Sequence, residues 1–152
     1  MLSMPNQNER AILGGATGLS VALAYPPSAN RLWRNHRGRM VVSSEAQAWK
    51  RAAAWKARAQ GCPLLVGPVA VSVILHPRLT KSGKESQIRL DVDGPIKITL
   101  DALQGVAYDN DRQVVRLSAM IGPPLQEGGL TVDVWPADLE GISSHSSEYA
   151  RL

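Results

Sequence analysis

Residues 91 to 113 read Asp-Val-Asp-Gly-Pro-Ile-Lys-Ile-Thr-Leu-Asp-Ala-Leu-Gln-Gly-Val-Ala-Tyr-Asp-Asn-Asp-Arg-Gln, and the rest of the chain is organised around them. Residues 87 to 90 before them are typical of the end of a strand, so Asp91 and Asp93, two positions apart, are expected to project from one face. Pro95 suits the first turn of a helix and Gly105 suits its end. An apolar stripe lies between these two positions and consists of Ile96, Leu100 and Leu103.

Further charged side chains follow on and after this predicted helix. Lys97 and Asp101 share one helix face, and Asp109 and Asp111 lie in a short loop before a strand that begins near residue 114. Carboxylates collected in this way suit Mg²⁺. A structural explanation competes, because Asp93 at a helix start can simply cap free backbone N–H groups.

The same stretch resembles the RusA-type Holliday junction resolvases. That family has an Asp-x-Asp-Asn signature, a Lys four residues after the second Asp, a Leu-Asp-Ala-Leu segment and an Asp-Asp-x-Gln segment. The matching positions here are Asp91, Asp93, Lys97, 100–103 and 110–113, and the resemblance also covers Pro26-Pro27-Ser28-Ala29-Asn30.

Two positions depart from the family pattern. Gly94 replaces the Asn of the first motif, and Asn110 replaces the first Asp of the second. The third catalytic carboxylate is therefore expected to be Asp111, with Asp109 as the alternative.

The resemblance implies a Mg²⁺-dependent endodeoxyribonuclease, with Mn²⁺ able to substitute and no organic cofactor. It would resolve four-way DNA junctions by paired symmetric nicks during recombination and repair, leaving 5′-phosphate and 3′-hydroxyl ends. A homodimer acting in the cytoplasm, in a bacterial or prophage setting, is implied as well. The implied catalytic residues are Asp91, Asp93, Lys97 and Asp111, of which the three aspartates would hold the metal.

Two other functions remain open on the sequence. One is a junction-binding module with a degenerate metal site, and the other is a metal-dependent nuclease acting on other branched DNA or another polyanion.

The charge distribution supports a polyanionic partner. Residues 1–90 carry 13 Lys or Arg against 3 Asp or Glu, whereas residues 91–152 carry 4 against 10. A basic surface around an acidic centre suits a metal-dependent enzyme that acts on nucleic acid. The residues expected to contact DNA are Arg31, Arg34, Arg37, Arg39, Arg78, Lys81, Lys84 and Arg89.

Length and composition indicate one α+β domain. A chain of 152 residues with 44% hydrophobic side chains can bury a core, and Cys62, the single cysteine, excludes an intrachain disulfide. No stretch approaches the ~20 apolar residues of a membrane helix. We expect a poorly ordered extension at 1–17, the endonuclease domain at 18–140 and a flexible tail at 141–152.

The pattern along the chain predicts a mixed sheet of about five strands covered by two main helices. Strands are expected at 19–25, 69–76, 86–90, 114–121 and 130–134, and helices at 44–60 and 95–105. Residues 30–39 are expected to form an arginine-rich loop, and residues 78–85 the turn of a basic hairpin. Ser44 and Gln47 form a potential capping box for the first helix, whose two apolar stripes suggest either a second packing partner or tolerated alanines. One of these stripes, or the strand at 130–135, is the expected dimer contact.

Overall fold

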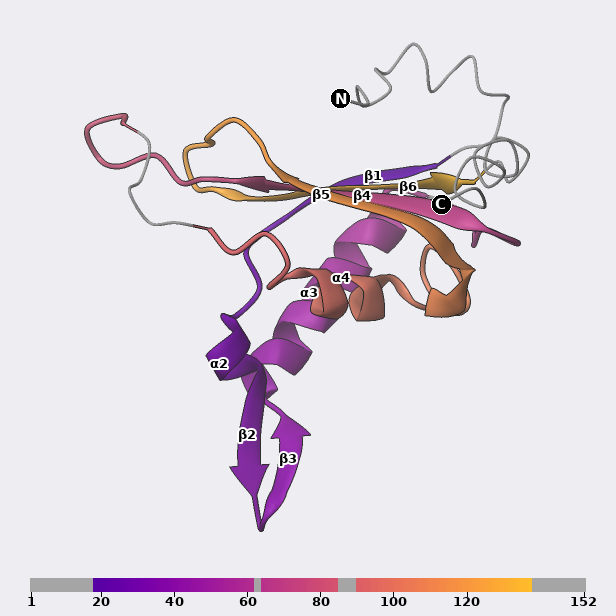
Figure 1. Ribbon diagram of the computed structural model, residues 1–152, viewed down its shortest axis with the longest axis horizontal. Coiled ribbons are helices and arrows are strands. Elements are labelled where there is room, and N and C mark those ends of the chain that lie inside the picture. Colours follow the sequence, from indigo (N-terminus) through magenta and orange to yellow (C-terminus); the bar gives the residue numbers. More distant parts are fainter. Residues whose placement is uncertain (1–17, 62–63, 85–89, 138–152) are drawn as a thin grey trace, which may run out of the picture.

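The computed structural model describes residues 18–61, 64–84 and 90–137, which form an α+β domain with a mixed sheet (Figure 1). Four strands make the main sheet, in the order β1 (Leu19–Leu23), β6 (Gly129–Pro136), β4 (Val69–His76) and β5 (Val114–Ile121). Two helices, α3 (Ser44–Ala59) and α4 (Ile96–Leu103), lie against one face of this sheet. The fold class expected from the sequence is confirmed.

The register of the sheet explains which side chains form the core. β6 pairs antiparallel with both β1 and β4, while β4 and β5 are parallel. Side chains opposite one another in register share a face. The face covered by the helices therefore carries the buried residues Leu19, Val21, Leu23, Val71, Val73, Leu75, Leu130, Val132 and Val134.

One of the two apolar stripes of α3 packs on this core. Ala46, Ala53 and Ala57 are buried, and the partly buried Trp49 donates its indole N–H to the carbonyl of Ala24 at 3.0 Å. The other stripe, formed by Ala48, Ala52, Trp55 and Ala59, is exposed. The N-cap of this helix is Ser43, one residue before the predicted cap, because Ser43 Oγ accepts from the N–H of Ala46 at 3.1 Å. The capping box predicted at Ser44 and Gln47 is therefore wrong.

Residues 30–39 are not the loop that the sequence analysis predicted. A short helix, α2 (Ala29–Leu32), leads into a separate two-stranded sheet of β2 (Trp33–His36) and β3 (Arg39–Val42), which projects from the body (Figure 1). Its turn has positive φ at both central residues, 52° at Arg37 and 78° at Gly38, as a type I′ hairpin turn requires. The sequence analysis missed this hairpin because its strands bury few side chains, so apolar and polar residues do not alternate clearly along them.

The second basic element is described only in part. Residues 80–84 form a turn, in which the N–H of Thr80 donates to the carbonyl of Lys84 at 2.7 Å. Most of the predicted return strand, including Arg89, lies outside the described residues, and Leu90 is not in a strand. The main sheet accordingly has four described strands instead of about five. Residues 1–17 and the tail after 137 also lie outside the described part.

None of the helices in the described part of the chain is long and apolar enough to cross a membrane.

Candidate active site

The two carboxylates of Asp91 and Asp93 lie just before α4, where the chain leaves Leu90 and turns into the helix. Asp91 also borders a recess of about 460 Å³. One side of the recess is residues 25–30, the Pro-Pro-Ser-Ala-Asn segment with Tyr25, and the other side includes Asp91, Gly94 and Pro95. The structure therefore brings together two segments that the resemblance linked although they are about sixty residues apart in the sequence.

The acidic pair carries an uncompensated charge. Asp93 raises the pKa of Asp91, first through a hydrogen bond with its side chain and second through charge repulsion. No Lys or Arg among the described residues forms an ion pair with either carboxylate. Two neighbouring carboxylates without a cationic partner form a donor set that fits a hard divalent cation.

A second charged group lies on and beyond α4. Lys97 Nζ is 2.7 Å from Asp101 Oδ1 and 3.3 Å from Asp111 Oδ2. The hydrogen bond with Asp101 is the largest cause of a raised pKa at Lys97, and Asp111 adds to it. Asp111, and not Asp109, is thus the loop carboxylate that contacts Lys97.

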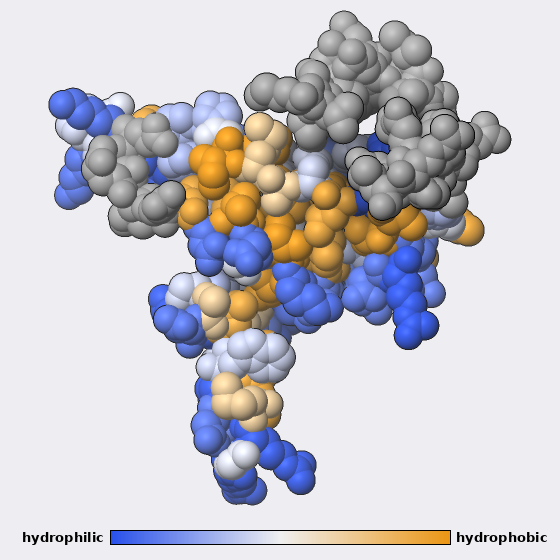
Figure 2. All heavy atoms as spheres, viewed as in Figure 1, coloured by the Kyte–Doolittle hydropathy of each residue, from blue (hydrophilic) through white to orange (hydrophobic). Residues whose placement is uncertain are grey.

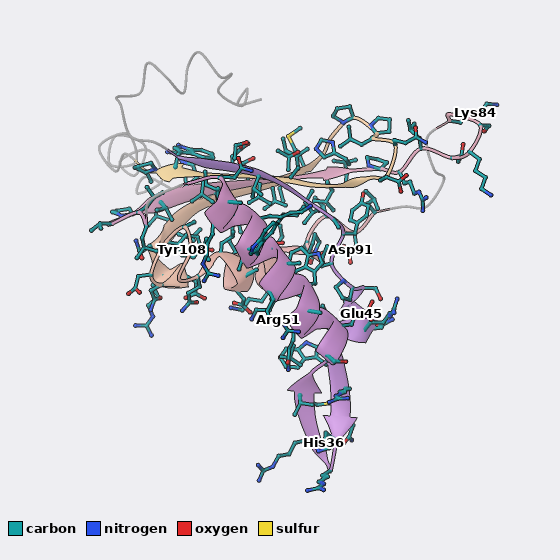
Figure 3. All side chains as sticks on the ribbon, turned by 180° about the vertical axis from the view of Figure 1, so that it is seen from behind. His36, Glu45, Arg51, Lys84, Asp91 and Tyr108 are labelled. Carbon is teal, nitrogen blue, oxygen red and sulfur yellow. The ribbon has the colours of Figure 1, made fainter. Side chains whose placement is uncertain are left out.

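Buried contacts hold this loop against the helix. Tyr108, which is labelled in Figure 3, is fully buried, and its hydroxyl donates to the carbonyl of Leu100 at 2.7 Å. Burial raises the pKa of Tyr108 well above its usual range, and the negative charges of Asp111 and Asp101 contribute. Tyr108 therefore stays neutral and positions the segment that carries Asp111.

Gln113 fixes the other end of the loop. Its side-chain oxygen accepts from the N–H groups of Asp109 and Asn110 at 2.9 and 3.0 Å. Its amide nitrogen donates to the carbonyls of Leu65 and Gly67 at 3.0 and 2.8 Å. The Gln of the family motif is thus a structural anchor for the loop.

The sequence analysis did not list Asp101, Tyr108 or Gln113 among the site residues. Asp101 could have been found, because its i,i+4 spacing from Lys97 on a helix predicts an ion pair. The contacts of Tyr108 and Gln113 depend on tertiary packing, for which the sequence carries no comparable signal.

Both departures from the family motif are tolerated by the structure. Asn110 caps the short helix η1 (Asp111–Gln113), with its side-chain oxygen accepting from the N–H of Arg112 at 2.9 Å. Asn and Asp are equally good in that role. A Cβ at Gly94 would lie 3.6 Å from Asp91 Oδ2, in ordinary van der Waals contact, so the backbone at this position does not require a glycine.

The predicted metal ligands do not form one compact cluster. Among the described residues, no three His, Cys, Asp or Glu side chains lie close enough together to hold a metal ion. The structure instead has the Asp91–Asp93 pair before α4, and Asp111 beside Lys97 and Asp101. Lys97 and Asp101 are both on α4 itself, so one short helix connects the two groups.

Five of the predicted DNA-contacting residues, Arg34, Arg37, Arg39, Lys81 and Lys84, lie on two separate projections. Figure 3 shows His36 at the tip of the β2–β3 hairpin and Lys84 at the end of the 80–84 turn, with Asp91 between them in this view. Of the seven predicted residues that the structure describes, two have acidic partners: Arg31 pairs with Glu45 at 2.8 Å, and Arg78 pairs with Glu127 at 3.4 Å. No carboxylate of the described residues pairs with Arg34, Arg37, Arg39, Lys81 or Lys84.

The chain is similar to several known proteins. Residues 24–134 of this chain match the sequence model of a protein family that is described as "Endodeoxyribonuclease RusA". Proteins named crossover junction endodeoxyribonuclease RusA from Escherichia coli O139:H28 and from strain K12 are each 30% identical over 111 residues, 72% of this chain and 87% of theirs. The protein of that name from Enterobacteria phage 82 is 30% identical over 112 residues, 72% of this chain and 86% of its own.

Proposed function

Because this chain belongs to the RusA family of endodeoxyribonucleases, we propose that it resolves four-way DNA junctions by paired, Mg²⁺-dependent nicks. The observation that carries the proposal is the carboxylate pair of Asp91 and Asp93, left without a cationic partner among the described residues and placed beside a recess. The expected products are 5′-phosphate and 3′-hydroxyl ends. The similar proteins come from bacteria and a phage, and we propose that this protein would act on DNA in the bacterial cytoplasm.

Asp91 and Asp93 would hold the metal, with Mn²⁺ able to replace Mg²⁺, and Asp111, which lies apart from the pair beside Lys97, is the proposed third ligand. The chemistry that the ion supplies when bound is acidification of a water molecule and neutralisation of charge on phosphate oxygens. Lys97 is cationic and 74% exposed, so it can approach the scissile phosphate and stabilise negative charge as the bond breaks. Asp101 keeps the ammonium group of Lys97 positioned beside Asp111.

The five unpaired cations on the two projections would bind phosphates on both sides of the acidic pair. Each such contact releases counterions from the DNA, so the affinity should fall with salt. This arrangement supports a substrate that extends in more than one direction from the active site, as the arms of a junction do.

Resolution requires two nicks, and the chain supplies one acidic site, so we propose a two-fold homodimer. Of the two contacts expected from the sequence, the 130–135 strand is in the interior: β6 is paired on both edges, and its side chains Leu130, Val132 and Val134 are buried. The exposed stripe of α3 remains, but it has one large apolar residue, Trp55.

The edge strand β5 offers a better surface. Among the described strands it pairs with β4 alone, and it exposes Val115, Leu117, Met120 and Ile121, with Arg116 as its single charge. Leu117 and Ile121 are in register with Val71 and Leu75, so they extend the core face beyond the helices. Figure 2 shows apolar side chains along the part of the sheet where β5 lies. Antiparallel pairing of two β5 strands would continue the sheet through the dimer.

The proposal is tested by separating cutting from binding. Asp93→Asn removes one negative charge without changing shape, so it should abolish Mg²⁺-dependent nicking of a synthetic four-way junction while leaving gel-shift affinity equal or higher. If the variant binds and cuts like the wild type, Asp93 is not part of the active site. If it loses both binding and cutting, Asp93 has a structural role. A wild type that binds junctions without cutting them in Mg²⁺ or Mn²⁺ would favour the binding-module alternative.

A further inference from the structure

The β2–β3 hairpin, Trp33–Val42, has two chemically different faces, and we call it the arm. Its register opposes Trp33 to Val42, Asn35 to Met40, Arg34 to Val41 and His36 to Arg39. Because opposed residues share a face and neighbours alternate, one face carries Trp33, Asn35, Met40 and Val42. The other face carries Arg34, His36, Val41 and Arg39, and Arg37 is in the turn.

The described part of the body covers the apolar face only in part. Trp33 is 52% exposed and Met40 65% exposed, and the space-filling view shows the arm standing clear of the domain (Figure 2). A two-stranded hairpin is marginally stable without a third layer to pack on. The arm thus presents an aromatic ring and a flexible thioether to a partner.

Charge identifies the class of partner. The arm has three arginines and no carboxylate, and none of the three pairs with an acidic side chain of the described residues. Two copies of the arm would repel each other, which disfavours arm exchange between subunits. A polyanion that also exposes flat apolar surfaces fits both faces, and DNA with unstacked bases has these properties.

The arm begins at the proposed active site. Ser28, Ala29 and Asn30 line the recess beside Asp91, and α2, which contains Ala29 and Asn30, leads directly into Trp33. The base of the arm is fixed to α3 through Ser43, the N-cap of that helix. Ser43 donates its N–H to the carbonyl of Leu32 at 2.8 Å and its hydroxyl to the carbonyl of Arg31 at 2.7 Å. The direction of the arm relative to Asp91 is therefore set by hydrogen bonds.

We propose that the arm enters the open centre of the junction, where Trp33 and Met40 contact bases unstacked at the branch point and the arginine face contacts phosphates. This inference rests on the proposed function and adds a structural determinant of the preference for branched over linear DNA. In a linear duplex the faces of the bases are stacked on one another, so Trp33 would have no partner there.

The test uses a four-way junction with 2-aminopurine at the branch point, and a linear duplex of matched length. Trp33→Ala should weaken junction binding about tenfold, change duplex binding less than twofold and leave the salt slope unchanged. Trp33→Tyr should recover most of the affinity, because it restores an aromatic ring. Trp55→Ala is the matched control, since Trp55 is 69% exposed on α3 and away from the arm. The 2-aminopurine fluorescence should respond to the wild type and to Trp55→Ala but not to Trp33→Ala.

An equal loss on both DNAs, an unchanged fluorescence response for Trp33→Ala, or dissociation of a dimer by this substitution would overturn the inference. In each case the junction preference of the wild type would still stand. A wild type without preference for the junction would instead contradict the proposed function, so the two failures are distinguishable.

Discussion

At the scale of single residues, the two candidate third carboxylates differ in their contacts. Asp111 Oδ2 is 3.3 Å from Lys97 Nζ, whereas Asp109 accepts no hydrogen bond from Lys97 and donates its backbone N–H to Gln113. The family motif alone did not decide between Asp109 and Asp111, because Asn110 replaces one of the aspartates of that motif.

We therefore predict that Asp111→Asn is as inactive in junction cleavage as Asp93→Asn, a loss of at least about 100-fold. Asp109→Asn, the matched control two positions away, should keep most of the activity because its side chain lies outside the Lys97 cluster. Initial cleavage rates in Mg²⁺ would check both, with thermal unfolding to confirm folding. The reverse ranking would assign the third ligand to Asp109.

At the scale of elements, the arm stores backbone strain. Arg37 is the only non-glycine residue with positive φ in the described part of the chain, a conformation that costs an ordinary residue roughly 1–2 kcal/mol and that Asn adopts more readily. A costly residue at a projecting tip suggests that its side chain is retained for binding.

Arg37→Asn should therefore make the arm more stable and the binding weaker. Amide exchange within β2 and β3 should slow by about fivefold, because the arm opens locally and the strain is relieved, while the salt slope of junction binding should fall by about 1. Arg39→Asn removes the same charge at an ordinary φ, so it should reduce the slope without slowing exchange. Unchanged exchange in Arg37→Asn would mean that the turn is unstrained.

The arm also shows what the sequence could and could not predict. The bounds of β4 and β5 were predicted to the residue and α3 to within one residue, since buried strands and an amphipathic helix have a clear periodicity. The arm has no buried face, and its turn carries Arg where Asn or Gly is the usual signal, so it was taken for a loop. Asp91 and Asp93 were identified by motif, but the contacts of Tyr108 and Gln113 required the fold.

At the scale of the whole molecule, the open edge of β5 predicts how two chains associate. Leu117→Glu places a charge on the apolar face of this edge, so it should convert the dimer to a monomer in sedimentation at micromolar concentration. The wild type should have about twice the 16.4 kDa chain mass. Trp55→Glu, the matched charge on α3, should remain dimeric. Dissociation by Trp55→Glu alone would move the interface to the exposed stripe of α3.

The central claim is that two such sites cut one junction in a paired manner. A synthetic four-way junction, labelled in turn on each of its four strands and incubated with Mg²⁺, tests this most directly. The account predicts nicks at symmetric positions in two opposed strands, giving ligatable duplexes with 5′-phosphate ends, and little cutting of linear duplex. Equal cutting of junction and duplex, or nicks confined to one strand in a wild-type dimer, would contradict it.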